Sequence, residues 1–278
     1  MLGLAQKEGS VAKRASGSSF YFAMRILPQA QRQAMFEIYS FCRAVDDIAD
    51  CDAPHAWRLE HLARWRNNID TLYAGHAPQD WDGLKRAVAQ FSLRKDDFLA
   101  VIDGMEMDGA QDIRAPDWPT LDLYCDRVAS AVGRLSVRVF GLGENDGLAL
   151  AHHLGRALQM TNILRDIDED AGVGRLYLPR EALAAAGIMS TDPATVIADP
   201  AIGIACMMVA ERAREHFAKA SEVMAACPRR QVRAPKIMQL AYRQMLEDMM
   251  ARGFSAPRTR VHVSKSHLLG IALRHAFL

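Results

Sequence analysis

Two clusters of carboxylates in this sequence have spacings that could bind a cation. The first is DDIAD at residues 46–50, and the second lies within QMTNILRDIDED at residues 159–170. On a helix, side chains four residues apart share a face, and like charges at that spacing destabilise the helix. Each cluster also falls near the expected C-terminal end of a helix, where negative charge is unfavourable. These local costs predict that something cationic compensates them.

The second cluster forms a longer row than the first. Asn162, Asp166 and Asp170 are spaced at i, i+4 and i+8, which places them along one helical face. Two such helices facing each other would line both sides of a cavity with oxygen ligands. These oxygens suit Mg²⁺, which also binds waters and the phosphate oxygens of a substrate. The pair of clusters therefore predicts a metal site at which a diphosphate leaves. Asp168 and Glu169 are expected to point away from this row.

Other kinds of site find little support in the composition. Five cysteines without a CxxC pair indicate neither a disulfide framework nor a zinc site. The nine histidines show no HxxxH or HExxH spacing and are interpreted as structural or surface residues. A net charge of +1, without a basic run interleaved with aromatics, argues against a nucleic-acid partner. The sequence also contains no GxGxxG dinucleotide loop.

The elements that must position both clusters are helices. Good helix formers dominate, apolar residues recur at three- and four-residue spacing, and strand signals are nearly absent. The glycines and closing proline of AGVGRLYLP predict a loop at 171–179. We find no linker between domains, so we predict one all-α domain over residues 1–278. The predicted helices span about 28–50, 53–73, 81–92, 95–108, 118–140, 145–170, 199–226, 234–252 and 264–277.

Four segments resemble the squalene and phytoene synthase family, and the resemblance covers about residues 16–275. They are SGSSFYFAMRILP (16–28), YSFCRAVDDIAD (39–50), YCDRVASAVGRLSVRVFG (124–141) and QMTNILRDIDEDAGVGRLYLP (159–179), with a looser match in RVHVSKSHLLGIALR (260–274). Within the family, the wording of segment 124–141 is most similar to the bacterial presqualene diphosphate synthases of the hopanoid pathway. Phytoene synthases more often carry an aromatic or other residue where Asp126 stands.

The resemblance implies a helical isoprenoid-synthase fold with a deep central cavity, and it assigns roles to individual residues. It implies that the catalytic residues are Asp46, Asp50, Asp166, Asp170 and Tyr124. The implied Mg²⁺ ligands, for which Mn²⁺ is an alternative ion, are Asp46, Asp50, Asn162, Asp166 and Asp170, with Asp47 in support. The implied substrate-binding residues are Ser19, Tyr39, Arg43, Gln159, Arg165, Arg260 and Lys265. Phe20, Phe22 and Met24 are candidates for the cavity wall.

The resemblance also implies the reaction. Two farnesyl diphosphates would join head to head to give presqualene diphosphate, without NADPH. A phytoene-type synthase using C20 substrates, a squalene synthase using NADPH, a terpene cyclase and a non-catalytic assembly protein are the alternatives, and the intact carboxylates argue against the last. The proton acceptor stays open between the released diphosphate and Tyr124.

Location follows from what the chain lacks. The N-terminus has no apolar core of signal-peptide type, and the apolar runs are far shorter than the roughly 20 residues of a spanning helix. We therefore expect a cytoplasmic protein that works beside other enzymes of squalene and hopanoid synthesis. The tail LLGIALRHAFL has two interpretations, an interfacial helix that touches the inner membrane face or a helix packed on the domain.

Overall fold

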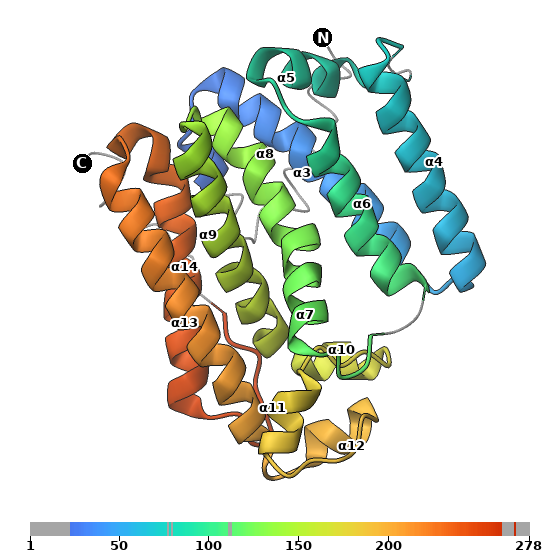
Figure 1. Cartoon of the computed structure of the whole chain (residues 1–278), viewed down its shortest axis with the longest axis vertical. Coiled ribbons are helices and arrows are strands. Elements are labelled where there is room, and N and C mark those ends of the chain that lie inside the picture. The colour runs from blue at the N-terminus through green and yellow to red at the C-terminus, as the bar shows by residue number, and fades with distance from the viewer. Residues whose placement is uncertain (1–22, 77, 79, 111–112, 263–269, 271–278) are drawn as a thin grey trace.

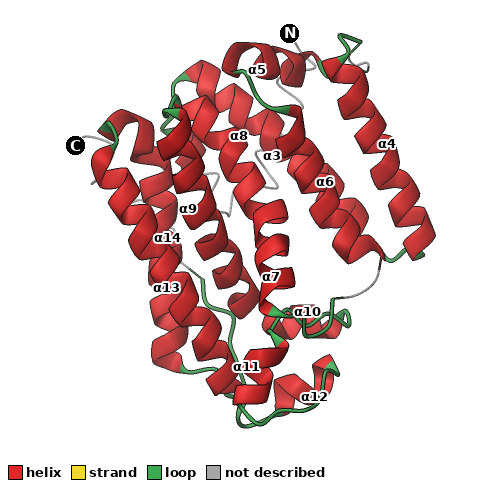
Figure 2. Cartoon of the chain, viewed as in Figure 1, coloured by secondary structure: helices red, strands yellow, loops and turns green. Residues whose placement is uncertain are grey.

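The computed structural model describes residues 23–76, 78, 80–110, 113–262 and 270. Within these residues every regular element is helical, as Figure 2 shows, and the one β-type contact is an isolated bridge between Arg114 and Leu176. The prediction of an all-α chain is therefore confirmed. The predicted helix at about 264–277 lies outside the described residues.

Helices α3 to α14 follow one another with short connections. Their bounds are α3 Gln29–Ala49, α4 His55–Tyr73, α5 Asp82–Phe91, α6 Lys95–Ala110, α7 Trp118–Cys125, the π-helical turn η1 Asp126–Ser130, α8 Ala131–Phe140, α9 Glu144–Arg165, α10 Ile167–Gly172, α11 Arg180–Ala185, α12 Pro193–Ala198, α13 Ile202–Ala226 and α14 Arg229–Arg252. The long helices run alongside one another, whereas the short helices α10, α11 and α12 gather at one end of the bundle (Figure 1).

Three differences from the predicted helices have local causes. The helix predicted over 118–140 contains a π-helical turn that separates α7 from α8. The helix predicted over 145–170 ends at Arg165, because Asp166 leaves the helical region with φ −101° and ψ 12°. Helices α11 and α12 were not predicted, although Asp192 caps α12 by accepting a hydrogen bond from the Thr195 N–H.

Buried apolar residues form two clusters, one on each side of α9 and η1. One cluster packs α9 against α13 and includes Leu164 and Phe217. The other packs α3 against α6 and includes Phe41 and Phe98, whose rings meet edge to face with centroids 5.0 Å apart. Partly buried residues, Leu158 among them, pack against both clusters. The described core is therefore continuous, and we retain the prediction of a single domain.

The π-helical turn η1 fits between two glycines. A Cβ atom on Gly155 of α9 would lie 2.6 Å from the Cα of Ser130, and one on Gly104 of α6 would lie 2.6 Å from Cγ1 of Val128. Glycine at these positions lets α6 and α9 approach the wider π turn without a clash. π turns inside helices often occur at functional sites, and this one lies directly after Tyr124.

Replacing Gly155 with alanine should destabilise the fold by about 1–3 kcal/mol, because the added Cβ overpacks backbone that has little room to move. Gly203→Ala in α13 is the matched control, since no heavy atom lies within 4 Å of its Cβ position. That variant should be neutral or stabilised by up to about 1 kcal/mol through helix propensity. Urea unfolding of both variants tests the packing, and Gly155→Ala being as stable as the control would contradict it.

Candidate active site

The two acidic clusters meet at one end of the bundle. The connection is Arg175, which stands in the loop directly after the second cluster. Its Nη1 donates to Oδ1 of Asp50 at 2.7 Å, and its Nη2 donates to the carbonyl oxygen of Ala49 at 3.0 Å. Asp50 and Arg175 are 125 residues apart in the sequence. The loop therefore ties the C-terminal end of α3 to the second cluster.

The pKa values of two carboxyl groups record how closely the clusters approach. Burial raises the pKa of Asp170 to about 7, and the charges of Asp166, Asp108 and Asp50 contribute to the rise. Burial also raises the pKa of Asp46 to about 6, with Asp50 as the next cause. Carboxylates from both clusters therefore share one electrostatic environment in which negative charge is in excess.

Arg43 compensates part of the first cluster. Its Nη1 donates to Oδ2 of Asp46 at 2.6 Å, and its Nη2 donates to Oδ1 of Asp47 at 2.8 Å. Tyr39 lies near enough that the charges of Arg43 and Asp46 act on its phenol, whose pKa is raised chiefly by burial. The structure therefore brings Tyr39, Arg43 and the first acidic cluster together. Without substrate, the guanidinium of Arg43 binds the carboxylates of that cluster.

The second cluster keeps its row although the helix breaks within it. The N–H of Asp166 donates to the carbonyl oxygen of Asn162, and the N–H of Asp170 donates to that of Asp166, both at 2.8 Å. The four-residue hydrogen bonding therefore continues across the break. Two arginines bind the carboxylate of Asp166: Arg165 through Nε at 2.7 Å and Arg260 through Nη2 at 2.6 Å. Asp168 instead binds Arg258 at 3.0 Å, as expected for a side chain that points away from the row.

Asn162 offers the clearest sign of a ligand that the protein itself does not supply. Its Oδ1 is buried and accepts no hydrogen bond within the described part of the chain, whereas its Nδ2 donates to Oε1 of Gln159 at 3.4 Å. A buried acceptor without a partner costs about 1–3 kcal/mol. An amide oxygen beside carboxylates is a fitting donor for a hard divalent cation, so these residues fit a magnesium-type site.

Sequence reasoning missed a buried group between the clusters. Asp108 of α6 is buried and accepts hydrogen bonds from Tyr124 at 2.8 Å and from Tyr177 at 2.7 Å. The two phenol rings stack with centroids 4.9 Å apart. Burial raises the pKa of Asp108, although Arg175 and both tyrosines oppose the rise. Asp108 has Asp112 four residues after it, so an i, i+4 acidic pair was present in the sequence and was overlooked. Tyr177 has no such signal, and only its meeting with Asp108 in space identifies it.

An apolar cavity extends into the bundle from the helices that carry the clusters. It encloses about 630 Å³, its open mouth included. On α9 the cavity-lining residues Leu154 and Leu158 precede Asn162 at four-residue spacing, and on α3 the lining residue Met35 shares a face with Asp46. The remaining lining residues come from the segment before α3 and from η1, α8, α9 and α14: Ala23, Met24, Leu27, Ala129, Val132, Gly133, Ser136, Val137, Phe140, Leu150, Ala151, Gly155, Ala234, Pro235 and Met238.

Not every predicted site residue can be placed. Met24 lines the cavity, which confirms its prediction as a wall residue. Ser19, Lys265, Phe20 and Phe22 lie outside the described residues. Within the described residues, no helix is both long and apolar enough to cross a membrane.

Comparison with known proteins gives one consistent family. The model described as squalene/phytoene synthase matches residues 13–267. The chain is 60% identical over 264 residues to a presqualene diphosphate synthase of Sinorhizobium fredii, covering 95% of each protein. It is 58% identical over 264 residues to one of Rhodopseudomonas palustris, again covering 95% of each.

More distant relatives share the fold. A phytoene synthase of Arthrospira platensis is 32% identical, covering 88% of this chain and 84% of that protein. The crystal structure of a dehydrosqualene synthase in complex with ligand superposes with a TM-score of 0.84 at 25% identity, covering 98% of this chain and 94% of that one. The isoprenoid-synthase architecture expected from the sequence is therefore confirmed.

Mg²⁺ should stabilise the protein more at about pH 8 than at about pH 5.5. Without metal, Asp46 and Asp170 have folded pKa values raised above the ordinary 3.8. The folded state then binds more protons than the unfolded state between about pH 4 and 7, so stability falls as pH rises through that window. Metal needs the deprotonated carboxylates and adds about 2.7 kcal/mol at a hundredfold excess over Kd. Melting curves of the protein and of Asp170→Asn measure this. An equal shift at both pH values, or in the variant, would contradict the site.

Arg175→Met should weaken Mg²⁺ binding, because the two clusters lose the side chain that joins them. It should also destabilise the fold by about 1–3 kcal/mol, because Asp50 loses its charged partner and the Ala49 carbonyl keeps only its hydrogen bond from Arg58. Arg180→Met is the matched control, since its exposed ion pair with Asp117 spans 3.4 Å and such pairs contribute about 0–1 kcal/mol. Titration of Mg²⁺ against melting temperature compares the two. If Arg175→Met behaves like Arg180→Met, then Arg175 does not hold the clusters together.

Proposed function

This chain belongs to the squalene/phytoene synthase family, and on that premise we propose that it condenses two farnesyl diphosphates head to head into presqualene diphosphate. The observation that carries the proposal is the meeting of two oxygen-rich clusters beside an apolar cavity. A diphosphate bound at the clusters would place its prenyl tail in the cavity, where apolar lining favours each buried methylene by about 0.8 kcal/mol.

Sequence identity favours this product over that of the phytoene synthases. The similarity to the presqualene diphosphate synthases is 58–60% identity over almost the whole chain, against 32% for the phytoene synthase. Met24, Met35 and Phe140 are bulky members of the cavity lining, and we propose that they limit the length of prenyl tail that the cavity accepts. Shortening the space for a tail favours a C15 substrate over a C20 one.

Magnesium would be held by Asp46, Asp50, Asn162, Asp166 and Asp170, with Asp47 supporting the first cluster and Mn²⁺ as an alternative ion. Bound there, the metal would supply Lewis-acid neutralisation of the departing diphosphate. The orphaned oxygen of Asn162 and the raised pKa of Asp170 support this donor set.

Arginines would bind the diphosphate oxygens. Arg43, Arg165 and Arg260 now bind carboxylates of the two clusters. When a cation takes those carboxylates, the guanidinium groups can turn to phosphate, which matches their planar fork as well as a carboxylate does. Each guanidinium therefore has a partner with and without substrate. Ser19 and Lys265 remain predictions for the same role, and Tyr39 and Gln159 for the reacting centre.

In the proposed reaction the C1–O bond of one farnesyl diphosphate breaks and diphosphate leaves with the electron pair. The C2=C3 double bond of the second molecule attacks the allylic cation, and loss of a proton closes the cyclopropane. The cavity excludes water that would capture the cation. Atoms and electrons balance without a reductant, so no NADPH is expected.

The buried group around Asp108 bears on which group accepts the proton. Tyr124 donates its hydroxyl proton to Asp108 and lies 3.3 Å from the hydroxyl of Tyr177. Burial and the charge of Asp108 raise the pKa of Tyr124 well above its ordinary value. Tyr124 is therefore protonated and a hydrogen-bond donor at neutral pH, and its ionised form is too scarce to serve as the base. This favours the released diphosphate as the proton acceptor.

Location and partners stay predictions of the same proposal. A protein that makes an amphipathic product from amphipathic substrates would work in the cytoplasm close to the inner membrane face and beside the enzyme that consumes presqualene diphosphate. The tail that would make the contact lies outside the described residues. Flotation with liposomes of anionic lipid measures such contact directly.

Purified protein with farnesyl diphosphate and Mg²⁺ should release presqualene diphosphate, and NADPH should change neither product nor rate. Mass spectrometry of the extracted products, with Asp46→Asn as an inactive control expected to lose several orders of magnitude in kcat, measures this. Squalene formed only with NADPH would identify a complete squalene synthase. Phytoene formed from geranylgeranyl diphosphate with equal efficiency would identify the chain as a phytoene synthase.

A further inference from the structure

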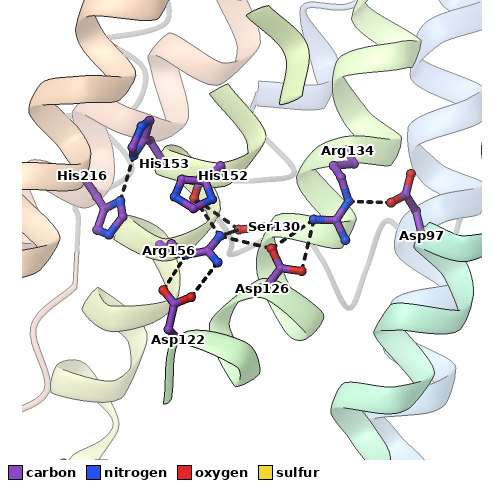
Figure 3. Close-up of polar contacts among 9 residues, drawn as sticks. All are labelled: Asp97, Asp122, Asp126, Ser130, Arg134, His152, His153, Arg156 and His216. Atoms are coloured by element: carbon purple, nitrogen blue, oxygen red, sulfur yellow. Dashed lines mark hydrogen bonds and ion pairs between the residues drawn. The ribbon is translucent and has the colours of Figure 1, made fainter. Parts of the chain in front are cut away.

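Two adjacent histidines and a third that lies far along the chain meet on the outside of the bundle. His152 and His153 stand on α9 and His216 stands on α13, and each offers a ring nitrogen within 4.8 Å of the others. Nδ1 of His153 lies 3.0 Å from Nδ1 of His216 (Figure 3). The absence of HxxxH spacing had led us to interpret these residues as structural or surface ones. A site shared by two helices leaves no such spacing.

The distances suit a tetrahedral metal. Zinc binds imidazole nitrogen at about 2.0–2.1 Å, so two such ligands lie about 3.3 Å apart. The nitrogens of His153 and His216 are already close to that separation. All three ring nitrogens lie within 4.8 Å of one another, so reaching a separation of about 3.3 Å needs a movement of at most about 1.5 Å. The ring of His152 is exposed and would make this movement.

The three rings are uncharged, as a metal requires, and a metal would replace the proton that His153 and His216 share in the hydrogen bond between their Nδ1 atoms. Burial lowers the pKa of His216 to about 4, and the charges of His153 and His152 lower it further. Burial likewise lowers the pKa of His152 and of His153. All three are therefore neutral at pH 7, and neutral imidazole is the form that binds metal.

The charged neighbours do not oppose a cation strongly. Arg156 and Lys219 disfavour positive charge at the histidines, whereas Asp122, Asp126 and Glu222 favour it. Arg156 is largely compensated, because Asp122 accepts from its Nε at 2.7 Å and from its Nη2 at 2.9 Å (Figure 3). Since Arg156 occupies both oxygens of Asp122, the fourth position on a metal would go to water.

This cluster is separate from the candidate active site. The cavity is lined by Ala151, Leu154, Gly155 and Leu158 of α9, whereas His153 points to α13. Its donors are also of the other kind, imidazole nitrogen in place of oxygen. Nitrogen donors select Zn²⁺ and related transition metals, while the oxygen clusters select Mg²⁺. The two sites can therefore fill independently.

We propose that His152, His153 and His216 form a binding site for a transition-metal cation of the Zn²⁺ type that joins α9 to α13. The bound ion holds two helices whose packing makes up much of the core. Helix α9 also carries Asn162 and ends at Asp166, so the ion would fix the helix that positions the second acidic cluster. The site does not depend on the proposed reaction.

Co²⁺ is the probe, because tetrahedral Co²⁺ on imidazole absorbs visible light far more strongly than octahedral Co²⁺ on oxygen. The full chain, metal-free and then given excess Mg²⁺, is titrated with Co²⁺, and Zn²⁺ is added to displace it. We expect one equivalent of strongly absorbing Co²⁺, its displacement by Zn²⁺, and a higher melting temperature with Zn²⁺. His152→Ala and His216→Ala should each weaken binding at least about tenfold.

His76→Ala is the matched control, since it removes one exposed imidazole outside the cluster and should leave the titration unchanged. His152→Ala removes an exposed side chain, so its folding is not at risk, and circular dichroism checks His216→Ala. The proposal is overturned if the wild type gives no tetrahedral Co²⁺ spectrum. It is overturned equally if the variant lacking all three histidines binds Co²⁺ and Zn²⁺ as the wild type does.

Discussion

Repulsion between carboxylates of two distant helix ends is the constraint that this fold must satisfy. The ends of α3 and α9 bring acidic side chains close enough that Asp50 acts on the pKa of Asp170. Arg43 and Arg175 balance part of this negative charge, and their ion pairs with Asp46 and Asp50 hold the clusters in place. The part that remains raises the pKa values of Asp46 and Asp170. Beside these carboxylates the neutral amide oxygen of Asn162 has no hydrogen-bond partner in the described part of the chain. A divalent cation with a diphosphate completes this balance, so the same charges that cost stability without ligand provide binding with it.

Helix α9 connects the parts of the molecule. One face lines the apolar cavity through Leu154 and Leu158, and the same face continues into the oxygen cluster at Asn162. Its glycine at position 155 admits the π-helical turn that follows Tyr124. On another side, Arg156 binds Asp122 and Asp126, and Figure 3 shows this pairing continue through Arg134 to Asp97 of α6. Displacement of α9 would therefore disturb cavity, clusters and core together.

How much could be predicted from the sequence depended on whether the signal was local. The i, i+4 rows of Asp46 and Asp166 are local, and most helix positions followed from local periodicity. At the helix break at Asp166, by contrast, two backbone hydrogen bonds link Asn162, Asp166 and Asp170, and residue spacing alone does not reveal them. Asp108 and Arg175 can be recognised as site residues only from their contacts with residues elsewhere in the chain. The histidine cluster was not recognised as a group for the same reason, because its members come from two helices.

The most direct test of the account is where metal binds when substrate is present. A crystal of the protein with Mn²⁺ and an unreactive thio analogue of farnesyl diphosphate would locate the ions by their anomalous scattering. The account predicts Mn²⁺ between Asp46 and Asp50 on one side and Asn162, Asp166 and Asp170 on the other, with the diphosphate bridging the ions and the prenyl chain in the apolar cavity. Mn²⁺ confined to one cluster, or a diphosphate bound away from both, would contradict it.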